Sequence, residues 1–159
     1  MTDNELKQKL QSIATGPALI ATAVAGLDDA TLRRKPAPGK WCIMEILGHL
    51  ADIEVLYGYR LRQMLADKNP VIAPIEQDDW ARNLGYLEAS PAELLDAYQA
   101  ARRANLRLLR RLKLEDLEKG AFHPELKRKV TVADLLGMMA GHDPNHLAQI
   151  ERIKQQHSK

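Results

Sequence analysis

The sequence contains very little cysteine and no long hydrophobic run. Its single cysteine, Cys42, excludes a disulfide within the chain and is typical of proteins from a reducing compartment. No stretch approaches the roughly 18 uninterrupted apolar residues of a membrane span. Residues 1–11 are polar and lack the apolar segment of a secretory signal. We therefore expect a soluble, cytoplasmic protein without a membrane partner.

An excess of charge of one sign is also missing. The chain carries 23 Lys and Arg against 21 Asp and Glu, and its net charge of +2 attracts neither nucleic acid nor an anionic membrane strongly. One local basic run could bind nucleic acid, but it spreads around a helix and acidic residues surround it, so we expect a solvated face with ion pairs. The basic residues are Arg102, Arg103, Arg107, Arg110, Arg111 and Lys113, and the acidic ones are Asp96, Glu115, Asp116 and Glu118.

Aromatic residues are scarce, at 4%, and no convincing alternation of apolar and polar residues marks a strand. The apolar residues are mostly Leu, Ala, Ile and Met, which suit helices. A chain of 159 residues has the length of one domain and can bury a core without disulfides or a metal. The sequence therefore predicts a single all-α domain over residues 1–159.

Three helix starts are clear, because a cap residue is followed three places later by an acid that can reach back to it. Apolar residues recur at helical spacing after each start, and also over residues 3–25, where Gly16-Pro17 is expected to kink or split the helix. Four apolar stripes that pack together predict a four-helix bundle with long connecting loops over 27–41 and 69–90. The three starts are Ser90 with Glu93, Thr131 with Asp134 and, with a weaker cap, Cys42 with Glu45.

Two histidines, His142 and His146, lie four residues apart near the end of the chain. On a helix this spacing places both on one face, about 6 Å apart along the axis, so that both can reach one metal ion. The spacing alone arises by chance in roughly one such chain in eight. Both side chains also lie in the middle of the apolar stripe, where unsatisfied polar rings are costly. We favour metal ligands over two core histidines that bond to neighbouring groups.

A third ligand could come from one of three other histidines. His157 lies in a polar tail about 16 Å beyond His146, and His123 lies in an irregular stretch where it could line the mouth of the site. His49 lies at the edge of an apolar stripe inside another helix, so it can meet His142 and His146 in the bundle interior. Three imidazoles with an open position match a catalytic site better than a closed structural one.

One carboxylate and one amide side chain lie near these histidines, and for each a role in the metal site is as probable as simple solvation. Asp52, one turn after His49, could orient an imidazole or act on a bound water, as a catalytic residue, or it could be a solvated carboxylate. Gln149, one turn after His146, has the same two interpretations.

Pro144 lies inside the histidine pair and removes a hydrogen bond to the carbonyl of Ala140. One outcome is a kinked but continuous helix in which water satisfies Ala140. The other is a new helix that begins with Asp143 as its cap, which moves His142 off the shared face. We favour the kink, because the apolar phase before residue 141 continues unchanged after His146.

The segments that carry these histidines resemble the DinB-like superfamily, including its YfiT-like group of metal-dependent hydrolases and thiol transferases. The segments that carry the resemblance are PAPGKWCIMEILGHLADIE (36–54), DDWAR (78–82) and TVADLLGMMAGHDPNHLAQI (131–150). The resemblance implies a four-helix bundle with up-down-down-up connections and a divalent metal held by His49, His142 and His146. It also implies a dimer, and a low-molecular-weight thiol as cosubstrate in some members. Cys42 departs from the pattern, which usually has Ser there.

The leading hypothesis is a metal-dependent enzyme, either a hydrolase or a low-molecular-weight-thiol transferase acting on a small molecule. Imidazoles suit Zn, Ni, Cu and Fe alike, and we expect Zn or Ni. The alternative is a non-catalytic helical bundle, stabilised by the metal, that dimerises or binds a partner. A homodimer fits either hypothesis.

Overall fold

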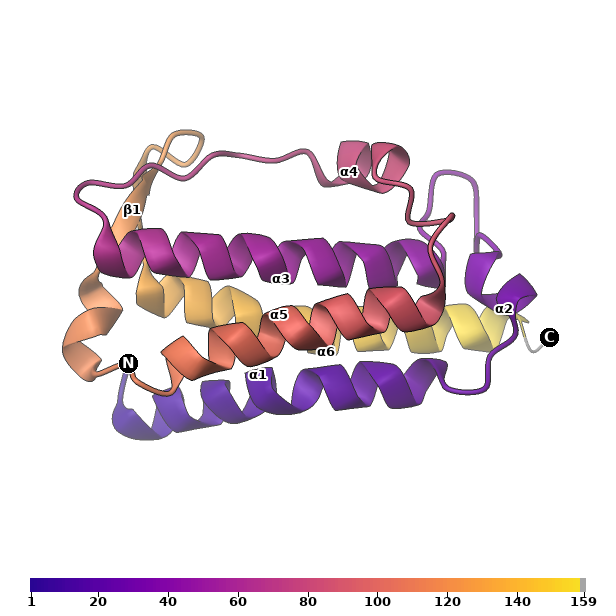
Figure 1. Ribbon diagram of the computed structural model, residues 1–159, viewed down its shortest axis with the longest axis horizontal. Coiled ribbons are helices and arrows are strands. Elements are labelled where there is room, and N and C mark those ends of the chain that lie inside the picture. Colours follow the sequence, from indigo (N-terminus) through magenta and orange to yellow (C-terminus); the bar gives the residue numbers. More distant parts are fainter. Residues whose placement is uncertain (158–159) are drawn as a thin grey trace.

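The computed structural model describes residues 1–157, without the side chain of His157. Four long helices form a bundle, as predicted, and two short helices, a 3-10 helix and a β-hairpin lie in the connections (Figure 1). The elements are α1 (Asp3–Val24), α2 (Asp29–Arg33), α3 (Ile43–Ala66), α4 (Gln77–Asn83), α5 (Pro91–Leu109), η1 (Leu114–Glu118), β1 (Gly120–His123), β2 (Arg128–Thr131) and α6 (Val132–His157).

The four long helices have up-down-down-up connections, as the resemblance implied. In Figure 1, α1 and α6 run in one direction, and α3 and α5 run in the other. Helix α3 packs against α5 and α6, and α1 packs against the same two helices. Because α3 and α5 are parallel, the chain must return along about 36 Å of helix between them. This return explains the long connection after α3, in which α4 lies against α3.

The β-hairpin was not predicted. Strands β1 and β2 pair antiparallel, with Ala121 opposite Val130, and both of these side chains are buried. Each strand has only four residues, so each contributes too short an alternation to be recognised in the sequence. The hairpin closes one end of the bundle and leads directly into α6.

The three predicted helix starts are confirmed by their hydrogen bonds. At α5, the Glu93 N–H donates to Ser90 Oγ over 3.2 Å and the Ser90 N–H donates to Glu93 Oε2 over 2.9 Å. The same reciprocal pair joins Thr131 and Asp134 before α6. At α3, the Cys42 N–H donates to the Glu45 carboxylate over 2.8 Å.

Both helices that contain an internal proline are continuous. Helix α1 runs through Pro17 without the predicted split, and α6 runs through Pro144 without a new start at Asp143. Each proline leaves the carbonyl four residues earlier without its usual N–H donor. The carbonyl freed by Pro17 belongs to Ile13, and the Arg102 guanidinium of α5 donates to it.

The carbonyl freed by Pro144 belongs to Ala140, and Ser12 Oγ of α1 donates to it over 3.0 Å. The predicted water is therefore replaced by a side chain of a neighbouring helix. Because this hydroxyl joins α1 to α6, it also helps to hold the two parallel helices in register.

Ser12→Ala is expected to lower the free energy of unfolding by about 1 kcal/mol, because the Ala140 carbonyl loses its donor in a half-buried position. For a chain of this size, the melting temperature then falls by about 2–4 °C. The matched control is Thr15→Ala, since the Thr15 hydroxyl donates to the carbonyls of Gln11 and Ser12 in its own helix. Equal melting temperatures for the Ser12 variant and the wild type would contradict this role.

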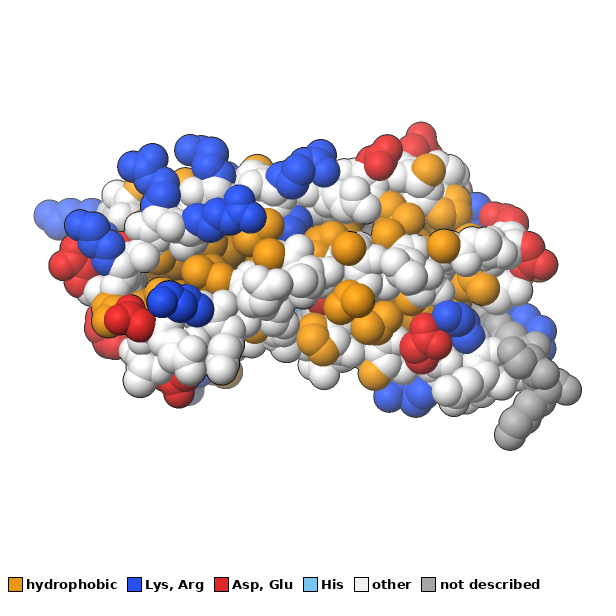
Figure 2. Space-filling view, turned by 90° about the horizontal axis from the view of Figure 1, so that it is seen from below, with side chains coloured by type: hydrophobic (Ala, Val, Ile, Leu, Met, Phe, Trp, Pro, Cys, Tyr) orange, Lys and Arg blue, Asp and Glu red, His pale blue; other side chains and the backbone are white. Residues whose placement is uncertain are grey.

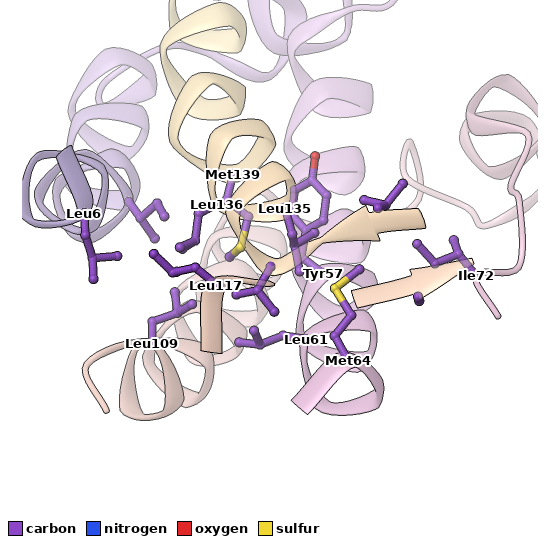
Figure 3. Close-up of a cluster of buried hydrophobic side chains, with 14 of the residues drawn as sticks. Leu6, Tyr57, Leu61, Met64, Ile72, Leu109, Leu117, Leu135, Leu136 and Met139 are labelled. Carbon is purple, nitrogen blue, oxygen red and sulfur yellow. The ribbon is translucent and has the colours of Figure 1, made fainter. Parts of the chain in front are cut away.

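The hydrophobic core is divided into two clusters, one toward each end of the bundle. Figure 3 shows the first cluster, where Leu6 of α1, Tyr57 and Leu61 of α3, and Leu135 of α6 converge. The second cluster joins the other ends of the same helices and includes Ile20, Ile46, Tyr98 and Ile150. Where the two clusters meet, buried and half-buried polar side chains of α3, α5 and α6 form a polar layer. Its buried or half-buried members are His49, Glu54, Arg102, Asn105, His142, Asp143 and His146.

Within residues 1–157, no helix has both the length and the apolar character that crossing a lipid bilayer requires.

Candidate metal centre

Three histidines meet in the polar layer, where α3 and α6 pack against each other. His49 of α3 is only 3% exposed, and His142 and His146 of α6 are half-buried. One ring nitrogen from each lies within 4.8 Å of the other two, and the Nε2 atoms of His49 and His142 are 3.1 Å apart. The structure therefore brings together the three residues that the sequence analysis selected. That they bind a metal remains a prediction.

Of the other two histidines, His123 lies apart from this cluster. His123 is the last residue of β1, and its Nδ1 accepts a hydrogen bond from the Leu126 N–H over 3.4 Å. The side chain of His157 lies outside the described part of the chain. Of the two alternatives whose side chains are described, His49 lies beside His142 and His146, and His123 does not.

Aromatic rings flank the cluster on both sides along the bundle axis. The Trp41 ring lies 4.8 Å from the His49 ring, and the edge of Tyr57 meets His142 at 5.6 Å, both measured between centroids. The Trp41 indole N–H also donates to the Asp78 carboxylate of α4 over 3.0 Å. These contacts restrict the imidazole orientations and exclude water from two sides.

A hydrogen bond selects the tautomer of His146. Its Nδ1 lies 3.0 Å from the amide oxygen of Gln149. Because that oxygen can only accept, Nδ1 carries the proton and Nε2 keeps its lone pair for a ligand. Of the two interpretations of Gln149, the structure supports the one in which it orients the imidazole.

Burial keeps all three imidazoles neutral. It lowers the pKa of His49 to about 3, with a further contribution from the neighbouring His146 and His142. Burial also lowers the pKa of His142 to about 4 and that of His146 below its usual value. A neutral imidazole is the form that binds metals, so the site is in its binding state at pH 7.

The donor set fits one divalent ion. Two nitrogens bound to a tetrahedral Zn²⁺ at about 2.0–2.1 Å lie about 3.3 Å apart. The His49–His142 separation of 3.1 Å is close to this value, and the third nitrogen lies within 4.8 Å of both. Three protein ligands leave at least one coordination position for a substrate or water.

Asp52 is held by a tyrosine from the long connection. The Tyr86 hydroxyl donates to Asp52 Oδ2 over 2.6 Å, and burial together with this bond raises the pKa of Tyr86. Asp52 also lines a surface hollow of about 350 Å³ together with Leu56 and Trp80. Among residues 1–157, no hydrogen bond joins Asp52 to the three histidines, so its catalytic role remains a prediction.

A buried ion-pair network lies beside the histidines and was missed by the sequence analysis. Arg102 of α5 is 2% exposed and donates to both carboxylate oxygens of Asp143, over 2.7 and 3.1 Å. It also pairs with Glu54 of α3 over 2.8 Å, and Asn105 donates to the other oxygen of Glu54 over 2.7 Å. Burial alone lowers the pKa of Arg102, but these two carboxylates raise it above its usual value. Since Asp143 adjoins His142, the network fixes α6 relative to α3 and α5 at the metal site.

This network corrects the interpretation of the basic run. Arg102 belongs to the core, whereas Arg103, Arg107, Arg110 and Arg111 are exposed as expected. Within residues 1–157, however, the run has only one ion pair on its outer face, between Lys113 and Glu115 at 3.7 Å. Figure 2 shows basic side chains gathered toward the end of the bundle where α1 begins and α5 ends. The spacing contained a signal, because Arg102 lies four residues after the buried Tyr98 and four before the buried Leu106.

A glycine of α1 makes room for the network. A side chain at Gly16 would place its Cβ 1.8 Å from Asp143 Oδ2, which is far closer than van der Waals contact. Gly16-Pro17 thus serves close packing of α1 against α6 rather than a break in α1.

The likeness of this chain to known proteins covers almost its whole length. YfiT of Bacillus subtilis, described as a probable metal-dependent hydrolase with an unusual four-helix bundle topology, is 27% identical over 150 residues, which cover 94% of this chain and 84% of YfiT. A candidate metal-dependent hydrolase of Oceanobacillus iheyensis is 28% identical over 154 residues, which cover 96% of this chain and 88% of the relative.

Solved structures have the same fold. The structure of YfiT superimposes with a TM-score of 0.93 at 24% identity, over 99% of this chain and 90% of YfiT. A mycothiol-dependent maleylpyruvate isomerase superimposes with a TM-score of 0.73 at 13% identity, over 94% of this chain and 63% of the isomerase. The family model of the DinB superfamily matches residues 13–150, which include all three clustered histidines, and the chain therefore belongs to the DinB superfamily.

Proposed function

We propose that this protein is a metal-dependent enzyme that acts on a small molecule, as a hydrolase or as a low-molecular-weight-thiol transferase. The observation that carries the proposal is the convergence of three neutral imidazoles, from two separate helices, within 4.8 Å. The relatives described as metal-dependent hydrolases support a metal-dependent reaction in general. The name of the mycothiol-dependent isomerase, whose fold is similar, is the reason to test thiol transfer beside hydrolysis.

In this proposal, each residue of the site has a distinct task. His49, His142 and His146 hold one divalent ion, which we expect to be Zn or Ni, and Gln149 keeps His146 in the binding tautomer. The ion supplies Lewis acidity, which lowers the pKa of a water or a thiol beside it. Trp41 and Tyr57 exclude bulk water from the imidazole rings. We assign the proton-accepting role to Asp52, which the Tyr86 hydroxyl holds in one orientation.

Two general probes test the reaction class. Hydrolysis is measured with p-nitrophenyl acetate, and thiol transfer with cysteamine and 1-chloro-2,4-dinitrobenzene, each with metal-free, Zn-loaded and Ni-loaded protein. We expect the metal to accelerate one of the two reactions. Equal rates with and without metal in both assays would contradict the proposed function.

Asp52→Asn is expected to lower the accelerated rate by about 100-fold while the metal content stays unchanged, because the amide cannot accept the proton. The matched control is Asp79→Asn, which removes an exposed carboxylate of α4 and should keep the wild-type rate. If the Asp52 variant keeps its full rate with bound metal, Asp52 has no catalytic role.

A further inference from the structure

Arg60 of α3 lies on the same helix face as His49. The two residues are eleven positions apart, so they project within about 20° of each other around the helix. Arg60 is half-buried, and one Nη donates to the carbonyl of Ala73 in the connection after α3, over 2.9 Å. Its Nε is fully buried and has no hydrogen-bond partner in the described part of the chain. The Nε of Arg102 is also buried and unpartnered, but two carboxylates accept from its other nitrogens. Arg60 has no such compensation among residues 1–157, so an acceptor from outside the chain would be stabilised at its Nε.

The charge of Arg60 is not neutralised by the protein. Among residues 1–157, no carboxylate forms an ion pair with it, whereas the buried Arg102 has two. Burial lowers the pKa of Arg60, and the nearby Tyr57 acts in the opposite direction. The fold therefore holds a partly desolvated guanidinium without a counterion, which is a favourable position for an anion.

Tyr57 connects this guanidinium to the metal centre. Its ring meets His142 edge-on at 5.6 Å, and its phenol lies close enough to Arg60 to interact electrostatically. His49 and Arg60 are separated by about 16 Å along the helix axis, but side chains on a helix lean toward its N-terminus, which here means toward His49. An extended arginine covers roughly 6 Å of that distance, but the shorter His49 side chain leans the same way by roughly 3 Å, so about 13 Å separates the guanidinium from the imidazole. A carboxylate bound to the guanidinium then lies about 10 Å from the metal centre.

We propose that Arg60 is a specificity-determining residue that binds a carboxylate of the substrate while another group of the same molecule occupies the metal centre. The Nε–H and an Nη–H of arginine form a planar edge that matches the two oxygens of a carboxylate. The inference rests on the proposed function and adds a substrate class to it: small molecules with a carboxylate about 10 Å from the reacting group.

Binding of two matched thiols to the Co²⁺-loaded protein tests this role without any enzymatic assay. The thiols are 6-mercaptohexanoate and 6-mercaptohexanol, which have equal chain length and differ in charge. Their binding is measured by the sulfur-to-cobalt charge-transfer absorption. The wild type is expected to bind the carboxylate about tenfold more tightly, as a charge-assisted hydrogen-bonded pair provides.

Arg60→Met should abolish this preference while leaving the cobalt content and the affinity for 6-mercaptohexanol unchanged. The matched control is Arg107→Met, which removes an exposed arginine of α5 and should keep the tenfold preference. If the Met variant does not fold, Arg60→Gln replaces it, because the amide can still donate to the Ala73 carbonyl.

The outcomes separate this inference from the proposed function. A wild type that binds cobalt and both thiols equally well overturns the role of Arg60 alone, and so does a preference that persists in both Arg60 variants. A wild type that binds no cobalt contradicts the metal centre itself, and the inference fails with it.

Discussion

His49→Ala is expected to reduce the metal content of the purified protein from about one ion per chain to less than about one tenth. The substitution removes one of three protein ligands, and the two remaining imidazoles on α6 form a weak pair. Elemental analysis after dialysis against a defined metal buffer measures this directly. A variant that keeps a full ion would show that His49 is not a ligand.

His123→Ala is the matched control, since it removes an imidazole that lies outside the cluster. It should keep the wild-type metal content. A loss of metal in both variants would indicate a general effect of removing histidine rather than a defined site.

Thermal melting with and without metal, combined with the two probe reactions, distinguishes an enzyme from a metal-stabilised bundle. At a metal concentration of 100 times its dissociation constant, binding to the folded state alone adds about 2.7 kcal/mol of stability. The wild type should therefore melt at a higher temperature with metal than without, and the His49→Ala variant should show no such difference. If metal raises the melting temperature of the wild type but accelerates neither probe reaction, the alternative of a non-catalytic, metal-stabilised module is favoured.

Arg102→Met is expected to lower the free energy of unfolding by about 3–5 kcal/mol. The change leaves two carboxylates, Glu54 and Asp143, buried without their cation, and it also removes the donor to the Ile13 carbonyl. Thermal unfolding followed by circular dichroism should show a melting temperature lower by roughly 6–20 °C. A decrease of less than about 1 kcal/mol would contradict the importance of the network.

Two further variants make the Arg102 test specific. Arg103→Met removes the neighbouring exposed arginine and should change the stability by less than about 0.5 kcal/mol. Combining Arg102→Met with Glu54→Gln and Asp143→Asn removes all three charges together. The triple variant should recover much of the loss, because the uncompensated carboxylates are the main cost.

Local features of the sequence predicted most of the fold. Helix caps such as Ser90 and Thr131 act within four residues, and an apolar stripe reports one face of one helix, so both can be recognised without knowledge of the rest of the chain. The β-hairpin was missed because its strands are short and gain their stability from packing against α3 and α6.

The candidate metal site was also largely predictable, for the same reason. His142 and His146 occupy the middle of one apolar stripe, and His49 lies at the edge of another, so two inward-facing stripes were enough to bring them together. The partners that orient or surround them were harder to predict. Gln149 was considered only as one of two interpretations, and the Tyr86 hydroxyl bound to Asp52 comes from a connection with no periodic pattern.

By itself, the sequence determined the four helices, their inward faces and the histidines on those faces, because hydrophobic periodicity and capping are short-range properties of the chain. Only the tertiary structure decided how the groups left without partners are satisfied. Ser12 bonds to the carbonyl freed by Pro144, and Arg102 neutralises Glu54 and Asp143, whereas Arg60 has no counterion among residues 1–157. These outcomes depend on which residues of distant segments come within about 3 Å of one another, and that is set by the packing of whole helices rather than by any local pattern.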